Sequence, residues 1–342
     1  MARMVGTQNQ VVWLFESGTF ANASGNGWPG LVQSINAVPT EGTYNERYLG
    51  GAGRDTDLFF QGPQSFNVSM VSHPQHFRHL AWAAGSNVDA GSPSPYTHVI
   101  TPIDNNVQTA FTSGPLNPFL SFGLEESNAT PGTGTNWVRT FKGAVVNTYE
   151  LTGTMGEILT ETITSIAVSG AWSSGAPTTF NAFTYGTGTL GSITDRPYVF
   201  NDVTVQIPSG AANIYETLTG FSFKLSNSLE TRFYMTGSRT PAAPQPTYRD
   251  ITLDLTFDAQ SERAKTLYET YYAGGSEFNT MLFIAAGGAG SRDCAIILSG
   301  CRIMDNFESP LQRDGINPNT IYIMAKDMVA NVNDLVQRYN PY

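Results

Sequence analysis

Hydrophobic and polar residues alternate with a period of two along much of the chain. In the segment Ile251-Thr-Leu-Asp-Leu-Thr-Phe257 the apolar side chains fall on one face and the polar ones on the other, which is typical of an antiparallel strand with one buried face. Further strands are predicted at 11–15, 66–71, 119–122, 137–146, 158–168, 203–207, 221–225, 281–285, 294–303 and 320–324. The pattern therefore predicts a mainly β fold.

Two segments instead repeat their apolar residues at helical spacing. The first, residues 74–84, carries an apolar stripe and stops at Gly85. The second, residues 259–272, follows Asp258 as a cap and stops at Gly274. Each predicted helix comes directly after a predicted strand, so the two helices occupy matching places in the sequence.

This match extends to an internal repeat of about seven elements in one order. The aligned pairs are 11–18 with 203–210, 30–35 with 220–225, 65–71 with 250–256, 137–146 with 294–303 and 162–168 with 320–326, together with the helices and an arginine-bearing loop. We expect two tandem β-sandwich or barrel domains, each flanked by a short α-helix. They cover residues 1–170 and 201–342, and a linker rich in Gly, Ser and Thr covers residues 171–200.

Each half has a long polar loop with two arginines, Arg47 and Arg54 in the first and Arg232 and Arg239 in the second. A long loop in a compact domain is either a mobile surface segment or functional. In the second interpretation these loops reach a neighbouring subunit, where arginines make forked contacts with carboxylates or carbonyls. Unpaired edge strands give another reason for assembly, since the edge of one copy can join the edge of the next.

Composition and charge narrow the class of function. Charged residues make up 13% of the chain, and the formal net charge of −10 disfavours a static grip on nucleic acid, which needs clustered Lys and Arg. No apolar run is long enough to cross a bilayer, and no signal peptide is indicated at the start. Cys294 and Cys301 are expected on opposite faces of one strand, as buried thiols and not a disulfide.

Candidate catalytic and metal-binding residues are few. His73, His76 and His79 recur at steps of three, which drift around a helix instead of converging on one ion, so packing or solvated roles are favoured. Acidic pairs such as Glu125-Glu126 lie in predicted loops, and no catalytic triad or nucleotide-binding motif is present. We therefore predict that the protein is not an enzyme and has no catalytic residue, metal site or cofactor.

An ordered set of motifs spans Tyr96 to Val168. It runs from Tyr96-Thr-His98 through LSFGLEE (120–126) and Phe141-Lys-Gly143 to Gly156-Glu157, which opens another strand. The second half repeats the pattern with FSFKLSNSLETRFYMTGSR, YRDITLDLTFD and a short helix. These motifs resemble the tail tube, or major tail, proteins of long-tailed bacterial and archaeal viruses.

The resemblance implies a virion structural protein that self-assembles into stacked rings, forming a hollow conduit for genome delivery into the host cell. It also implies that inner strands of neighbouring domains line the lumen and that the long loops reach the adjacent ring. With two domains in each chain, a homotrimer would close a ring that otherwise needs six single domains, although six chains remain possible.

The same resemblance implies partners and a location. The partners are other copies of the chain and the tape measure, terminator and distal tail proteins. Viral DNA would pass through the lumen without specific binding, because a negative lumen repels phosphates. The expected location is the virion tail, after synthesis in the host cytoplasm, with no membrane involved.

Three alternatives stay open. A β-sandwich carbohydrate-binding or adhesin module would share the low charge and the aromatic content but act as a monomer. Another tail component such as a terminator would form one ring and no stack. A β-rich glycosidase would need two carboxylates at a defined separation in a cleft.

Overall fold

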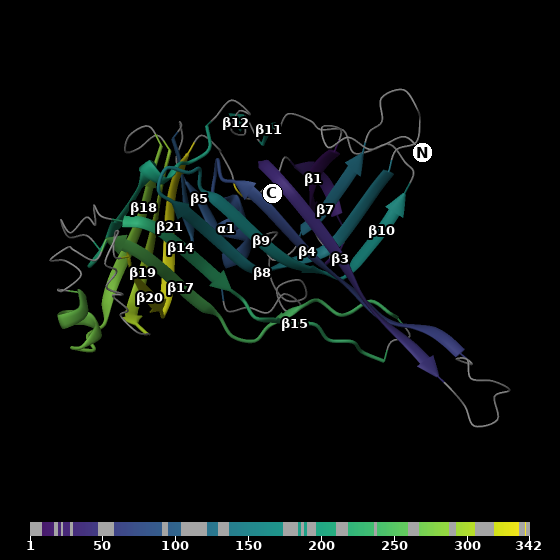
Figure 1. Cartoon of the computed structure of the whole chain (residues 1–342). Coiled ribbons are helices and arrows are strands. Elements are labelled where there is room, and N and C mark those ends of the chain that lie inside the picture. Colours follow the sequence, from purple (N-terminus) through teal and green to yellow (C-terminus); the bar gives the residue numbers. More distant parts are fainter. Residues whose placement is uncertain are drawn as a thin grey trace.

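The computed structural model is dominated by antiparallel strands, with short helical turns between them (Figure 1). It describes residues 9–16, 20–21, 23–27, 30–46, 58–90, 95–103, 122–128, 137–173, 184–185, 188–189, 196–209, 218–235, 238–258, 267–286, 292–304, 318–334 and 339. The mainly β fold predicted from the sequence is confirmed. None of the described helices is both long and apolar enough to cross a membrane.

The elements fall into two series, which we name the first half (residues 9–173) and the second half (residues 203–334). The first half contains β1 (Asn9–Glu16), β2 (Ala23–Gly27), β3 (Leu31–Glu46), β4 (Leu58–His73), α1 (Arg78–Ala84), β5 (Asn87–Ala90), β6 (Tyr96–Ile100), β7 (Phe122–Asn128), β8 (Trp137–Thr154), β9 (Thr160–Ala167) and β10 (Ser169–Ser173). The segment between the halves contains β11 (Thr184–Tyr185), β12 (Gly188–Thr189) and η2 (Phe200–Asp202). The second half contains β13 (Val203–Gln206), β14 (Leu218–Ser226), β15 (Leu229–Glu230), β16 (Gln245–Pro246), β17 (Asp250–Asp258), η3 (Tyr268–Tyr272), β18 (Phe278–Ala285), β19 (Asp293–Ile303), β20 (Pro318–Ala325) and β21 (Asp327–Asp334).

One continuous run of antiparallel pairs crosses both halves. Its order is β3–β4–β9–β8 in the first half and β14–β17–β20–β19 in the second, and β8 pairs directly with β14. We call it the long sheet. A second layer has the order β1–β7–β8–β10 in the first half and β13–β18–β19–β21 in the second. Strands β8 and β19 therefore belong to both layers of their half.

The pairing register is also the same in the two halves. Val145 and Val146 on β8 face Ile166 and Ser165, while Arg302 and Ile303 on β19 face Met324 and Ile323. A bulge interrupts β7 between Phe122 and Leu124, and one interrupts β18 between Phe278 and Thr280. These pairs stand at equivalent places, so the repeat seen in the sequence has a counterpart in strand order and register.

Each half has a glycine kink in the strand that links its layers. Gly143 on β8 has φ +63° and Gly300 on β19 has φ +62°, a region that glycine enters without strain. Next to each kink the chain makes the same contact: Val168 N–H donates to Lys142 O over 3.2 Å, and Lys326 N–H donates to Ser299 O over 3.0 Å. The kink turns each strand from one layer into the other.

The strand pairing corrects two of the aligned pairs of segments. Val11 stands at the place of Val205, where the sequence alignment pairs it with Val203. Ile35 stands at the place of Phe221, where the alignment pairs it with Leu225. The sequence alignment is therefore shifted by two residues at Val11 and by four residues at Ile35. A shift by an even number of residues leaves the same side chains on the buried face of the strand, so the alternation in the sequence could not reveal it.

The first helix is shorter than predicted and the second is described only at its end. Helix α1 starts at Arg78 and not at Pro74, because the Pro74 carbonyl accepts from Tyr198 N–H over 3.0 Å instead of closing a helical turn. It stops at Gly85 in the left-handed region, as predicted. Of the second helix, residues 259–266 lie outside the described residues, and η3 is a single π-helical turn.

Cys294 and Cys301 are both buried and unpaired on β19, as thiols. The predicted opposite faces are wrong, because the kink at Gly300 interrupts the alternation and turns Cys301 towards the core as well. Burial raises the pKa of both thiols, Cys294 most strongly. The prediction of buried thiols is confirmed.

Candidate functional site

The long sheet has one buried face and one face turned away from the core, which we call the open face. Along β17 the side chains of Leu253 and Leu255 are buried, while those of Asp254 and Thr256 lie on the open face. The neighbouring strands alternate in the same way, so the open face is mostly polar. Among its residues are Thr148, Thr152, Thr160, Thr162, Thr164, Ser222 and Ser226.

Carboxylates outnumber amines in a hollow at the centre of the open face. Glu150, Asp250 and Asp254 line this hollow of about 300 Å³ together with Lys224. Lys224 stands directly across the strands from Glu150, which also accepts from Ser222 Oγ over 3.0 Å. Burial, and then the charge of Glu150, raise the pKa of Asp254. The hollow therefore presents net negative charge with short hydroxyl side chains around it.

The two halves are joined across the long sheet by direct strand pairing. Residues of β8 from Thr148 to Thr154 pair in register with β14 residues from Ser226 to Gly220. By position in the repeat, β8 corresponds to β19 and β14 to β3. Within the described residues, β3 pairs on one side only, with β4, and it ends the long sheet opposite β19. The strands at the two ends of the long sheet, β3 and β19, are therefore the counterparts of β14 and β8, which pair with each other at its centre.

Strands β3 and β4 continue past the body of the protein as a two-stranded ribbon, seen at the lower right of Figure 1. We call residues 40–46 and 58–64 the arm. Residues 40–44, 60 and 61 of the arm are exposed, and the rings of Tyr44 and Phe60 stack with centroids 4.8 Å apart while each stays nearly half exposed. An exposed ribbon has no buried face and hence no alternation of apolar and polar residues, so the sequence pattern predicts a loop here.

The second arginine-bearing loop runs along this arm. We call residues 227–249 the brace, which includes β15 and β16 and extends towards the arm in Figure 1. Arg239 donates from Nε to Gly62 O over 2.8 Å, from Nη1 to Gln61 Oε1 over 2.5 Å and from Nη2 to Glu41 Oε1 over 3.1 Å. This guanidinium therefore ties the two arm strands to the second half of the same chain.

The four arginines predicted to contact other subunits have different surroundings. Arg239 makes the forked contacts expected of it, but to its own chain. Arg232 is half exposed and pairs with Glu230 over 3.0 Å. Arg47 and Arg54 lie outside the described residues. Contact of these residues with a neighbouring subunit stays a prediction.

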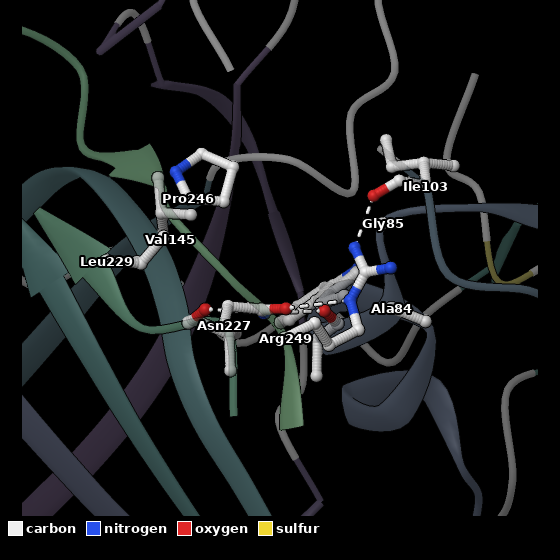
Figure 2. A pocket seen from close by; sticks show the side chains of 11 residues that line it. Ala84, Gly85, Ile103, Val145, Asn227, Leu229, Pro246 and Arg249 are labelled. Carbon is white, nitrogen blue, oxygen red and sulfur yellow. Dashed lines mark hydrogen bonds between the residues drawn. The ribbon is translucent and has the colours of Figure 1, made fainter. Parts of the chain in front are cut away.

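The brace is anchored where it leaves β14. Asn227 Nδ2 donates to Ala83 O over 2.8 Å and to Val146 O over 3.0 Å, and Arg249 donates to Asn227 Oδ1 and to Ile103 O (Figure 2). The cavity among these residues measures about 30 Å³, room for no more than a few water molecules. The cavity is too small for an organic ligand, and the residues around it hold the start of the brace against the first half.

The three closely spaced histidines do not converge on one point. His73 Nδ1 lies 2.9 Å from Leu159 O, whereas His79 accepts from Trp13 Nε1 over 3.2 Å and pairs with the buried Glu161. Burial lowers the pKa of His76, with help from Arg78. Among the described residues no group of His, Cys, Asp and Glu is arranged to hold a metal ion. His76 and His79 have packing roles in the core.

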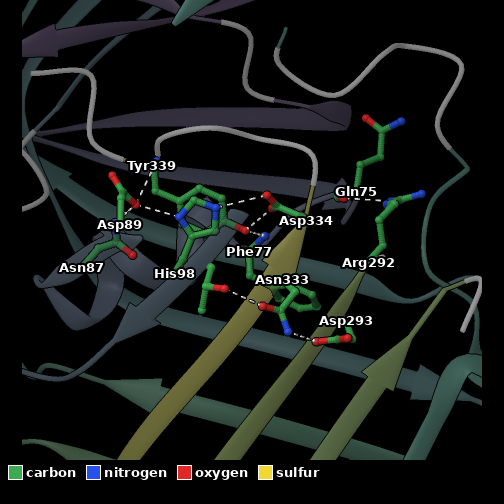
Figure 3. Close-up of polar contacts among 11 residues, drawn as sticks. Gln75, Phe77, Asn87, Asp89, His98, Arg292, Asp293, Asn333, Asp334 and Tyr339 are labelled. Carbon is green, nitrogen blue, oxygen red and sulfur yellow. Dashed lines mark hydrogen bonds and ion pairs between the residues drawn. The ribbon is translucent and has the colours of Figure 1, made fainter. Parts of the chain in front are cut away.

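The fourth histidine is the centre of a buried polar network that sequence reasoning did not predict (Figure 3). His98 on β6 lies 2.6 Å from Asp89 on β5 and 3.1 Å from Asp334 on β21. The ring of Tyr339 stacks on it at 3.9 Å, and Tyr339 OH donates to Asp334 over 2.6 Å. Burial alone would lower the pKa of His98, but the two carboxylates raise it to about 9. This cation fastens the first-half hairpin β5–β6 to the second half.

The comparison with known families gives one match that covers nearly the whole chain. A family model described as phage tail tube protein matches residues 6–320. No curated protein matches the chain in sequence.

Proposed function

The chain belongs to the phage tail tube protein family, a structural family of the virion tail, and from this we propose that its copies close into rings that stack into a tube for genome delivery. The resemblance stated from the sequence is confirmed at the level of the family. The finer proposal, of rings and a conduit, depends on the two ends of the long sheet.

Ring closure is supported by the β8–β14 pairing inside the chain. This joint connects two halves with the same strand order, and β19 and β3 are the strands at equivalent places at the ends of the sheet. The residues after β19 that correspond to Thr148–Thr154 are 305–311, which lie outside the described residues; if this stretch of one copy meets β3 of the next in the same way, the sheet continues around a ring. Among the described residues the second edge of β3 has no partner strand, and a long edge of this kind favours one. We propose three copies to a ring, with six also possible, since each chain supplies two units.

This proposal includes two tandem domains, residues 1–170 and 201–342, with residues 171–200 as the linker. The repeated strand order and register on the two sides of the linker support it. The shared long sheet means that the domains would be fused edge to edge and not hinged.

We propose that the open face lines the lumen. A polar surface with an excess of carboxylates at Glu150, Asp250 and Asp254 repels phosphate and offers hydroxyls in place of sticky apolar patches. DNA would then pass without specific binding. This refines the expectation of a negative lumen by naming its residues.

The remaining partners follow from the family and from the arm. We propose that the arm, with Arg47 and Arg54 beyond its described residues, reaches a neighbouring subunit. Arg232 on the brace is a second candidate for such a contact. Tape measure, terminator and distal tail proteins are proposed as the other partners, and synthesis in the host cytoplasm as the origin.

The test is negative-stain electron microscopy of the concentrated protein, with edge-blocked variants beside it. Asn36→Pro and Ala37→Pro are compared, because successive N–H groups of β3 point alternately to β4 and to the open edge. The proline that replaces a residue whose N–H points to the open edge should leave the midpoint of thermal unfolding near that of the parent protein and yet abolish rings. Rings with six lobes and threefold symmetry are expected of the parent protein. Monomers at all salt concentrations, or rings from both proline variants, would overturn ring closure through β3.

A further inference from the structure

The path of the brace over the first half suggests where the arm lies on another copy. After β14, the brace crosses a corner of the first half formed by β8 next to its kink at Gly143 and by the turn between β9 and β10. There Leu229 packs against Val145, which is buried together with Ala243 of the brace, and Leu229 N–H donates to Asn147 Oδ1 over 2.9 Å. We call the surface around Val145 and Val168 the first-half corner.

The repeat provides an equivalent corner in the second half, and its chemistry is different. The register of β19 with β20 puts Arg302 at the place of Val145, and the contact beside Gly300 puts Lys326 at the place of Val168. Arg302 and Lys326 are 57% and 68% exposed, and both pair with one carboxylate, that of Glu277, at 3.3 and 2.7 Å. This second-half corner is a solvated surface with one more positive than negative charge among these three groups.

The repeat also identifies which segment would cross that corner. On β14, Leu225 faces Ile251, and on β3 the equivalent Pro39 faces Phe66. Counting on by the same step, Asn227 at the start of the brace corresponds to Glu41 at the start of the arm. Glu41 is 37% exposed, and its carboxylate accepts from Arg239 with capacity for further donors. The brace places the apolar Leu229, two residues after Asn227, on its apolar corner. The arm carries the acidic Glu41 two residues before Thr43, the residue at the place of Leu229, and the corner that it would meet is basic.

We propose that the arm of one copy lies across the second-half corner of another copy, with Glu41 beside Arg302 and Lys326 of the partner subunit. The proposal rests on the ring closure above and goes beyond it, because it assigns the contact outside the shared sheet. In this arrangement Glu41 bridges Arg239 of its own chain and the basic pair of the partner subunit. The charge match also gives the ring a direction, since the first-half corner is already covered by the brace of its own chain.

The experiment is a charge swap read out by assembly. Glu41→Arg and Arg302→Glu are made singly and together, and the concentration at which half of the protein sediments as rings is measured for each. We expect each single variant to raise this concentration by about tenfold or more, because like charges would meet, and the double variant to recover most of the loss.

Two controls separate the contact from general charge effects. Arg196→Glu changes a half-exposed arginine that also pairs with a carboxylate, Asp202, but lies beside Arg292 at the opposite end of β19. It should leave assembly unchanged. Arg239→Ala tests whether any effect of Glu41→Arg comes from loosening the arm within its own chain.

The outcomes for this contact and for the ring are distinct. Rings from the parent protein and equally from both single variants would overturn the arm contact and leave ring closure standing. Failure of the double variant to recover would also overturn it, because no coupling between the two positions would exist. Absence of rings from the parent protein would overturn both proposals.

Discussion

The first and second halves share a scaffold but differ in what they attach to it. Both pair their strands in the same order, with the same bulge and the same glycine kink. The first half adds the arm and the β5–β6 hairpin, while the second adds the brace and a charged corner. Three of these additions contact the other half: the hairpin pairs with β21, and the brace lies on α1 and the arm. The difference shows that the halves are complementary and not interchangeable.

The largest expected effect comes from the hairpin, which only the first half has. His98→Asn leaves Asp89 and the buried Asp334 facing each other without the cation between them. Breaking a buried ion pair from one side costs about 3–5 kcal/mol, and urea unfolding at neutral pH should show a loss of that order. A loss below about 1 kcal/mol would mean that the hairpin is held by strand pairing alone.

The same variant should also change the pH dependence of stability. Because the pKa of His98 is raised to about 9 in the folded protein, its contribution is complete below the unfolded value near 6.5 and is lost as the pH rises through 9. The parent protein should lose stability over this window, whereas His98→Asn should not. His73→Asn, which changes a histidine outside this network, serves as the control and should keep the decline.

Alanine at either of the two glycine kinks should reduce the free energy of unfolding by an intermediate amount, and by more at Gly143 than at Gly300. A Cβ at Gly143 would lie 2.5 Å from Val168 Cγ2 and 2.9 Å from Phe20 Cζ, whereas at Gly300 its nearest neighbour is the flexible Lys326 side chain at 2.8 Å. Gly143→Ala should cost about 2–4 kcal/mol, from positive φ plus overpacking. Gly300→Ala should reduce the free energy of unfolding by about 1 kcal/mol, because the positive φ is strained for alanine while the Lys326 side chain can move away.

Urea unfolding of the two alanine variants checks this ranking. Equal losses would indicate that backbone strain dominates and that the surroundings of the kinks do not matter. A larger loss at Gly300 would contradict the packing seen around Gly143.

The smallest effect is expected at the contact of brace and arm. Arg239→Ala removes hydrogen bonds that are partly solvated, so the free energy of unfolding should fall by only about 1 kcal/mol. Local opening of the arm should rise about fivefold and appear as faster limited proteolysis there. Arg232→Ala, which removes the exposed pair with Glu230, is the matched control and should digest at the parent rate.

The repeat and the core strands could be predicted from sequence because burial of one face leaves a visible alternation. The segments around Leu253, Val145 and Ile297 all showed it, and all are in the long sheet or second layer. The arm strands, the hairpin β5–β6 and β21 were missed. The arm has no buried face, and the hairpin is short with a mixed pattern, so neither leaves a clear period.

The candidate site could also be predicted only in part from the sequence. The acidic net charge and the arginine-bearing loops could be read from the sequence, but the placement of Glu150, Asp250 and Asp254 on the open face depends on which side of each strand faces the core. The contact of Arg239 with Gln61 and Gly62 joins residues far apart in sequence. Nothing local at either position indicates it.

The family, the mainly β class and the repeated order of elements could be recognised in the sequence, since they depend on local patterns that recur along the chain. The fusion of the halves through β8 and β14, the path of the second loop as a brace and the burial of His98 between two carboxylates became visible only in the folded chain. These features are pairings between distant segments, and their stability comes from contacts that form only when both segments are already placed.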